Sequence, residues 1–256
     1  MIERRTYALG IFLIGILSWG VLSCTETVRE SPVDPLEDSP RQRAMVDSIG
    51  AALAGPMKAR SAEEALLVEL DELYQPLTPE QREFMEAIRN LDGADPSRGV
   101  ASGIDWIRVE DQQVMGPAGE QTMSLQLLPE NVWLAFGQLN EAMKKDLGHG
   151  LVIGSGYRTP ANQLSIFVTY MPYYEYSAMK TLPHVSLPGA SDHNRIERQG
   201  LDFVSESGVD LRYSDPAAFR ALAEHQWLLA NAERFGFVGE GVGSASPWHW
   251  HFVSEL

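Results

Sequence analysis

Two histidines and one aspartate, placed in three separate segments, limit the folds open to this 256-residue chain. The segments are Ser191-Asp192-His193, Gly200-Leu201-Asp202 and Pro247-Trp248-His249. Two imidazoles and a carboxylate can fill three corners of a tetrahedron around zinc, with water at the fourth. Taken singly, each residue indicates little, because a lone histidine is more often packed in a core and an aspartate is usually solvated. If the fold brings these three side chains together, we expect the protein to be a metallohydrolase.

Cys24 is the only cysteine of the chain. A disulfide scaffold and a thiolate zinc finger are therefore excluded. A catalytic cysteine is excluded too, because the single thiol lies beside an export signal. Any metal must be held by histidine and carboxylate.

The N-terminus has the three parts of a secretory signal. Arg4-Arg5 precede an apolar run over residues 11–17, and Val21-Leu22-Ser23-Cys24 follows. The run is shorter than the ~20 residues of a spanning helix. The last four residues resemble the bacterial lipobox, which predicts a signal peptide over 1–23 and lipidation of Cys24. The alternative is an uncleaved N-terminal anchor, and both place the remaining chain outside the cytoplasm.

The formal charge of −15 excludes some partners. An acidic chain without a basic tract is a poor nucleic-acid binder, because the phosphate backbone would repel it. It is also a poor peripheral binder of anionic lipid. We therefore expect the lipid anchor at Cys24 to hold the protein to the bacterial membrane, facing the periplasm.

Composition divides the rest of the chain into three parts. Residues 24–42, rich in Glu, Asp, Pro and Ser, are expected to be a disordered tether. Residues 43–100 are expected to form a helical segment, because 61–64 and 78–81 have the capping-box form. Breaker residues at 92–99 precede a metallopeptidase-like domain over 101–256.

Within that last part the pattern predicts an α+β fold, with helices packed on one face of a small, mostly antiparallel sheet. Helices are expected over 129–147, ending at Gly148, and over 214–235. Strands are expected at 151–153, 201–204 and 248–253, and residues 168–187 are expected to be a loop.

Five ordered motifs over residues 125–253 resemble the zinc D-Ala-D-Ala carboxypeptidases of the VanY type, within a wider group that includes D-Ala-D-Ala dipeptidases and Hedgehog-like folds. The motifs are Ser155-Gly156-Tyr157-Arg158 with Gln163, Pro188-Gly189-Ala190-Ser191-Asp192-His193, Gly200-Leu201-Asp202, Asn231-Ala232 with Phe235-Gly236-Phe237-Val238, and Trp248-His249-Trp250.

The resemblance implies a role for each matching residue. His193, Asp202 and His249 would be the zinc ligands. Arg158 would pair with the substrate carboxylate or the developing oxyanion, as a guanidinium fork can. Its alternative is a structural salt bridge. Gln163 would hydrogen-bond the substrate, Ser191 would support the ligand loop, and Tyr157 would pack.

Two departures from the family pattern stand out. The segment between His193 and Asp202 carries two extra residues, which a loop can absorb. More seriously, Ser246 stands where the family has a catalytic Glu that transfers protons. Such transfer is commonly worth ~10²–10⁴ in rate. Glu240, His251 and Asp192 are the candidates for that role.

Three functions remain open at this stage. The first is a zinc carboxypeptidase acting on peptidoglycan stem peptides as a monomer. The second is a descendant that binds zinc and such a peptide without cutting it, which Ser246 favours. The third is a structural lipoprotein in which the His and Asp set is accidental.

Overall fold

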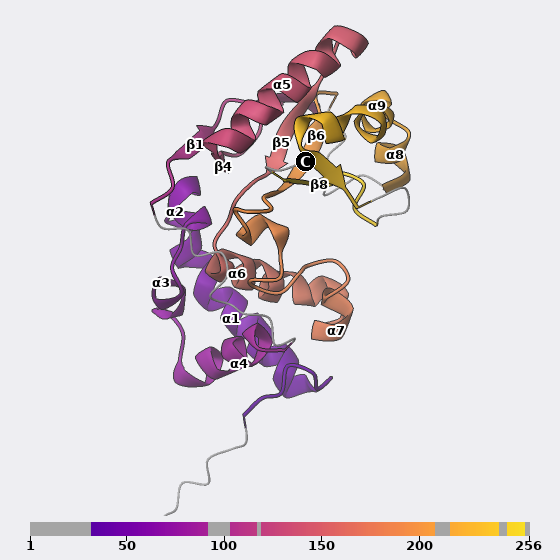
Figure 1. Ribbon diagram of the computed structural model, residues 1–256. Coiled ribbons are helices and arrows are strands. Elements are labelled where there is room, and N and C mark those ends of the chain that lie inside the picture. The colour runs from indigo at the N-terminus through magenta and orange to yellow at the C-terminus, as the bar shows by residue number, and fades with distance from the viewer. Residues whose placement is uncertain (1–31, 92–102, 117–118, 208–215, 241–244, 254–256) are drawn as a thin grey trace, which may run out of the picture. The chain divides into compact units, whose positions relative to one another are not determined.

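The computed structural model describes residues 32–91, 103–116, 119–207, 216–240 and 245–253 (Figure 1). The predicted signal peptide over 1–23 and the predicted lipidation site Cys24 lie outside these residues. Within the described residues, none of the helices combines the length and the apolar character that crossing a membrane requires.

The N-terminal segment is helical, as predicted. Its helices are α1 (Pro40–Lys58), α2 (Ala62–Leu66), α3 (Leu70–Tyr74) and α4 (Pro79–Arg89). Ser61 and Thr78 each accept a hydrogen bond from the third residue of the following helix, and that residue bonds back. Both predicted capping boxes are therefore present. The chain differs from the expected tether in being folded before residue 42, since Val33 and Gln42 are buried.

The central sheet has four antiparallel strands in the order β5-β6-β8-β7. They are β5 (Leu151–Ser155), β6 (Gly200–Ser205), β7 (Phe237–Gly239) and β8 (His249–Phe252). Three of these were expected at these places. The hydrogen-bonded register sets Asp202 opposite His249, so two segments 47 residues apart in sequence meet on neighbouring strands.

Helices cover this sheet and extend away from it. They are α5 (Glu130–Leu147), α6 (Pro160–Tyr170), η1 (Met171–Tyr174), α7 (Ala178–Thr181), η2 (Asp192–Asn194), α8 (Pro216–Arg220), α9 (Ala223–Asn231) and η3 (Ala232–Phe235). The end predicted for α5 is correct, because Gly148 takes the left-handed conformation at φ 80° that terminates helices. The α+β fold class is confirmed.

Three local predictions were wrong or incomplete. The helix expected over 214–235 is divided, because the chain is extended at Leu222 before α9 begins. The expected loop over 168–187 contains η1 and α7. Five strands were not foreseen: β7 of the central sheet, and β1 (Trp106–Val109), β2 (Gln113–Gly116), β3 (Gly119–Thr122) and β4 (Gln126–Pro129).

Two hydrophobic cores support the site from different sides. One packs α5, α9 and the sheet around residues such as Phe136 and Phe203. The other joins α1, α3 and α4 to α6 around residues such as Ile49, Phe84 and Phe167. The N-terminal helices thus share a core with α6, and residues 32–256 form one compact unit. Figure 1 shows α1 and α4 beside α6, away from the helices on the sheet.

Candidate metal centre

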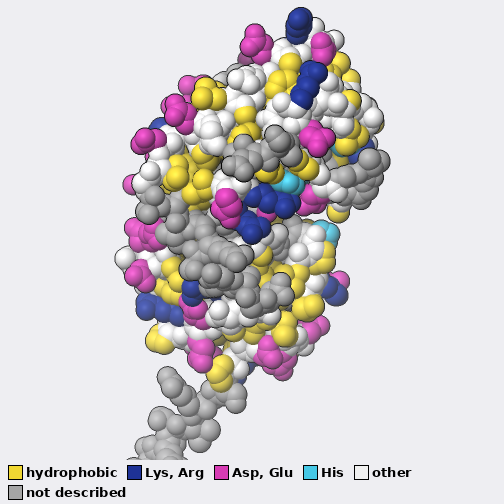
Figure 2. Space-filling model, viewed as in Figure 1, with side chains coloured by type: hydrophobic (Ala, Val, Ile, Leu, Met, Phe, Trp, Pro, Cys, Tyr) yellow, Lys and Arg dark blue, Asp and Glu magenta, His cyan; other side chains and the backbone are white. Residues whose placement is uncertain are grey.

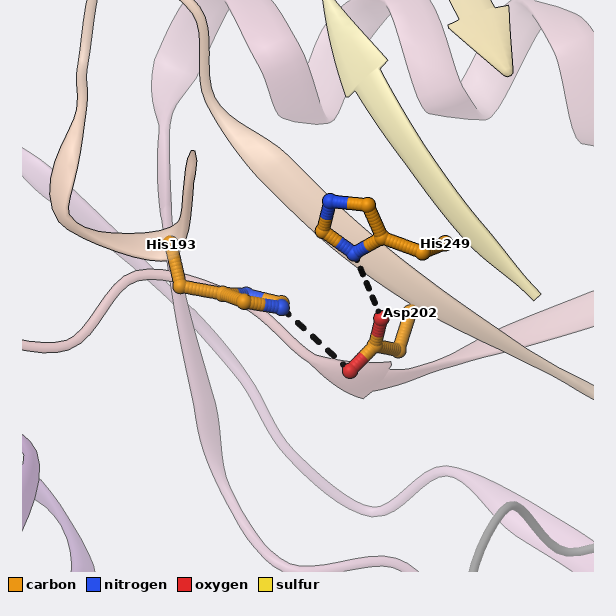
Figure 3. A group of neighbouring side chains, drawn as sticks. All are labelled: His193, Asp202 and His249. Atoms are coloured by element: carbon orange, nitrogen blue, oxygen red, sulfur yellow. Dashed lines mark hydrogen bonds and ion pairs between the residues drawn. The ribbon is translucent and has the colours of Figure 1, made fainter. Parts of the chain in front are cut away.

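His193, Asp202 and His249 converge on one point (Figure 3). Asp202 comes from β6, His249 from the start of β8, and His193 from the short helix η2. Each offers one ligand atom, and these atoms lie within 4.8 Å of one another. The three side chains that the sequence placed in separate segments are therefore brought together.

A hydrogen bond at one ring nitrogen of His193 leaves the other ring nitrogen, Nε2, facing the metal group. Its Nδ1 lies 2.9 Å from the carbonyl oxygen of Gly156, which can only accept, so Nδ1 carries the proton. Burial, followed by the charge of Arg158, lowers the pKa of His193 and favours the neutral ring. The Nε2 lone pair of that ring lies 3.3 Å from Asp202 Oδ2. Two acceptors facing each other fit a cation between them.

Asp202 and His249 complete the donor set. Asp202 Oδ1 lies 2.8 Å from His249 Nδ1. The other ring nitrogen, Nε2, lies 3.9 Å from the carboxylate of Asp192. A negative charge at this distance favours the protonated form of the ring. Two imidazole nitrogens and one carboxylate are the donor chemistry that suits zinc, so the residues present fit this metal.

The charges of the group depend on one another. Burial disfavours the charged form of Asp202, but the charges and hydrogen bonds of His193 and His249 outweigh it and hold the pKa of Asp202 far below its usual range. Burial also opposes protonation of His249, but the nearby carboxylate of Asp192 and the hydrogen bond to Asp202 raise its pKa to about 10. Without metal, a proton therefore neutralises part of the negative charge of the site.

The loop between the first two ligands lies against β6. A Cβ atom at Gly200 would stand 2.9 Å from the backbone of Asp192 and from the nitrogen of His193. Only glycine therefore allows the η2 turn to approach the strand so closely. Ser191 supports the same turn, since it is 4% exposed and its carbonyl accepts from the nitrogen of Asn194.

Charge pairing joins the loop after His193 to Asp192. Arg195 and Arg198 lie 3.5 and 3.3 Å from the carboxylate of Asp192. Arg198 also donates to His251 Nδ1 at 3.3 Å. Figure 2 shows Lys and Arg side chains gathered beside a His near the middle of one face, whereas acidic side chains are spread over most of it.

The contacts of His251 bear on its candidacy as a base. Because a guanidinium can only donate, His251 Nδ1 is the accepting nitrogen and is held against Arg198. Burial and the charge of Arg198 both lower the pKa of His251. This geometry favours a role for His251 in holding the loop rather than in proton transfer.

Arg158 is fixed beside the metal group by two side chains. Its Nε donates to Gln163 Oε1 at 2.6 Å and its Nη1 to Ser155 Oγ at 2.7 Å. Burial lowers the pKa of Arg158, while the charge of Asp202 opposes that shift. Gln163 is 1% exposed, and its Nε2 donates to the carbonyl of Ser186. Both ends of the Gln163 amide are thus engaged, which favours a role in positioning Arg158.

Ser246 and Glu240 lie near the last ligand. Both line a small hollow together with His249 and His225. The backbone nitrogen of His249 donates to the carbonyl of Ser246 at 2.9 Å, and this bond closes the turn that brings Ser246 close to the strand. The charge of Glu240 favours protonation of His249 and of His251. Glu240 is therefore the carboxylate that shares a hollow with the serine at the family's Glu position.

Three supporting residues were missed or undervalued in the sequence. Ser155 bonds Arg158 and the Gly156 carbonyl orients His193. Both residues belong to the Ser155-Gly156-Tyr157-Arg158 motif, and this motif was the sequence signal that could have indicated their roles. Asp192 was considered only as a base, yet its carboxylate faces His249 and two arginines. No feature of the sequence predicted which side chains Asp192 would contact.

An α+β fold with a partly buried group of two histidines and one aspartate defines a class of metallopeptidase-like proteins. Residues 125–255 match the family model VanY, described as D-alanyl-D-alanine carboxypeptidase. The chain belongs to this family of peptidases, and the family prediction is confirmed. No curated protein sequence matches the chain.

Solved structures similar to the chain are carboxypeptidases and a pentapeptidase. The LdcB LD-carboxypeptidase has 23% identity over 60% of this chain and 71% of its own, with a TM-score of 0.45. The E175A mutant of the D,D-pentapeptidase VanY from a VanB-type cassette, in complex with Zn(II), has 19% identity over 63% and 83%, with a TM-score of 0.41. DacB from Streptococcus pneumoniae D39 has 19% identity over 59% and 86%, with a TM-score of 0.39.

Proposed function

We propose that this protein is a zinc-dependent carboxypeptidase that removes the terminal D-alanine from peptidoglycan stem peptides. The observation that carries the proposal is the convergence of His193, Asp202 and His249 in a chain of this family. A zinc ion held there supplies a Lewis acid that polarises the scissile carbonyl and lowers the pKa of water.

The residues beside the metal group divide the remaining tasks. Arg158 binds the terminal carboxylate of the peptide, because its guanidinium is held beside Asp202 by Gln163 and Ser155. Water adds to the peptide carbonyl, and the bond to the terminal amine breaks. Glu240 accepts the proton from that water and returns it to the leaving amine. Support for Glu240 comes from the hollow that it shares with His249 and Ser246.

The function is tested by incubating purified protein with muropeptides that end in D-Ala-D-Ala, with and without a chelator. We expect release of free D-alanine that stops when metal is removed and returns when zinc is added. A zinc-loaded protein that binds the peptide but releases nothing would contradict hydrolysis.

The proton-transfer role is tested by two substitutions. Glu240→Gln is expected to lower kcat by about 10²-fold, which is within the usual range for general-base catalysis. Ser246→Glu restores the carboxylate of the family pattern and is expected to rescue the Glu240→Gln variant. An unchanged kcat in Glu240→Gln would show that another group moves the proton.

A second candidate function is a zinc-containing protein that binds peptidoglycan peptides without cutting them. Ser246 favours it, because a serine hydroxyl cannot act as a base near neutral pH. The two functions predict the same zinc content and the same binding of a D-Ala-D-Ala peptide, but only the first predicts D-alanine release.

We also propose that the protein is exported as a monomer and anchored through lipidated Cys24, facing the periplasm. A cell-wall substrate and the signal-like N-terminus support this location. Cys24→Ser should move the protein from the membrane fraction to the soluble fraction. Retention in the membrane fraction would support an uncleaved N-terminal anchor instead.

A further inference from the structure

The N-terminal segment reaches the residues that carry Arg158. Residues 65–68 form the end of α2 and the start of its connection to α3, and three of their carbonyl groups accept hydrogen bonds from the start of α6. Thr159 donates from its backbone nitrogen to Leu66 at 2.9 Å and from Oγ1 to Val68 at 2.7 Å. Asn162 donates from Nδ2 to Ala65 at 2.7 Å.

The donors of these hydrogen bonds are shielded from water, and the bond to Val68 is buried. Thr159 is 6% exposed, Asn162 is 7% exposed and Val68 is fully buried. A buried hydrogen bond is electrostatically stronger than an exposed one, and leaving its donor without a partner is costly. The start of α6 is therefore held to residues 65–68 by bonds that are unfavourable to break.

Arg158 lies between this contact and the metal group. Its backbone nitrogen donates to the carbonyl of His193 at 3.1 Å. Its carbonyl accepts from Asn194 Nδ2 at 2.7 Å. Thr159, the next residue, is bonded to residues 66 and 68. The backbone of Arg158 is thus tied to the ligand turn on one side and to the N-terminal segment on the other.

We propose that residues 65–68 position Arg158, so that the N-terminal helical segment is a working part of the substrate site. The segment lies outside residues 125–255, which match the family model. The proposal rests on the proposed function in one respect, which is that Arg158 binds the carboxylate of the peptide. A displacement of about 1 Å in a positioning group can cost about 10²-fold in rate, so small shifts of this backbone matter.

A purely stabilising role for the same contact makes a different prediction. The shared core of α1, α3, α4 and α6 already joins the segment to the rest of the chain. If the three hydrogen bonds only added to that stability, their loss would lower the melting temperature without changing peptide binding. If they position Arg158, binding weakens in the folded, zinc-loaded protein.

The test combines hydrogen exchange with binding of the dipeptide D-Ala-D-Ala to the full-length, zinc-loaded protein. Asn162→Ala removes the bond to Ala65 and keeps the Thr159 hydroxyl that caps α6, so it is the specific test. Thr159→Val removes the bond to Val68 together with the cap bond from the backbone nitrogen of Asn162. Thr159→Ser keeps the hydroxyl and serves as the rescue variant. Tyr176→Phe is the control, because it removes the hydrogen bond from Tyr176, which follows η1, to Asp47 in α1, and this bond does not involve α6.

In Asn162→Ala and Thr159→Val we expect amide exchange over residues 158–162 to accelerate about tenfold and dipeptide binding to weaken about tenfold, with unchanged zinc content. Thr159→Ser and Tyr176→Phe should behave as the parent. Exchange and binding that match the Tyr176→Phe control would overturn the proposal. A parent that fails to bind the dipeptide would contradict the proposed function instead, and the exchange rates alone would then decide whether residues 65–68 hold the Arg158 backbone.

Discussion

The metal group and the Arg158 group are positioned by different kinds of structure. Asp202 and His249 are fixed by strand register, and a slip of one residue would turn either side chain to the opposite face of the sheet. Arg158 instead depends on the hydrogen bonds that its side chain donates to Gln163 and Ser155, and on those that Thr159 and Asn162 donate to the distant residues 65–68. Each such bond contributes about 1 kcal/mol. We therefore expect the loss of a metal ligand to have a larger effect than the loss of any single support of Arg158.

The largest effect should come from the metal group. His249→Ala removes one of three ligands and should weaken zinc binding by at least about 10²-fold, since even outer-shell changes cost 10–100-fold. Metal analysis after dialysis against a weak chelator measures this. His149→Ala, which alters a half-exposed histidine paired with Glu224 outside the site, is the control and should keep its zinc. Equal zinc in both variants would show that the ligands are misassigned.

Substitution of Arg158 should weaken peptide binding and leave zinc binding unchanged. Arg158→Ala is expected to weaken binding of a D-Ala-D-Ala peptide by about 10- to 150-fold, which corresponds to the roughly 1.5–3 kcal/mol of a charged hydrogen bond. Zinc content should not change. Arg158→Lys keeps the charge but not the two-sided fit to Gln163 and Ser155, and it should recover only part of the affinity. Zinc loss in Arg158→Ala would break the distinction between the two groups.

The pH dependence of zinc binding should also be set by the metal group alone. In the metal-free protein the pKa of His249 is raised to about 10, so this ring carries a proton at neutral pH. That proton must leave before Nδ1 can bind a metal, and zinc affinity should rise about tenfold per pH unit between about pH 7 and 9. Calorimetry in buffers of different ionisation enthalpy measures the released proton. Binding without proton release would contradict the predicted charge state.

A smaller effect is expected where the two groups meet, at the turn that carries His193. Gly200→Ala places a Cβ atom 2.9 Å from that turn. The displacement should cost about 1–3 kcal/mol of stability and weaken zinc binding several-fold. Gly137→Ala is the control, because a Cβ at this position in α5 has no neighbour within 4 Å. That variant should be as stable as the parent or slightly more so.

The sequence predicted the metal group better than its surroundings. Strands at 151–155 and 249–252 and the end of α5 at Gly148 follow from local patterns and were predicted nearly to the residue. The paired short strands β1 to β4 were missed, because each has only four residues and little alternation. Their pairing depends on partners elsewhere in the chain, which a local pattern does not report.

The supports of Arg158 show the same limit. Gln163 was expected to contact substrate. It lies five residues after Arg158, and its side-chain oxygen accepts a hydrogen bond from Arg158. The contact with residues 65–68 spans more than 90 positions in sequence. Backbone carbonyl groups, which carry no residue identity, accept these bonds. Such a contact depends on the tertiary fold and leaves no motif.

The central claim is that His193, Asp202 and His249 hold one zinc ion. Anomalous diffraction at the zinc edge, on crystals of the full-length protein grown with zinc, tests it most directly. We expect a single strong peak about 2.0–2.2 Å from His193 Nε2, a carboxylate oxygen of Asp202 and His249 Nδ1. A peak held by other residues, or none at these three side chains, would contradict the account.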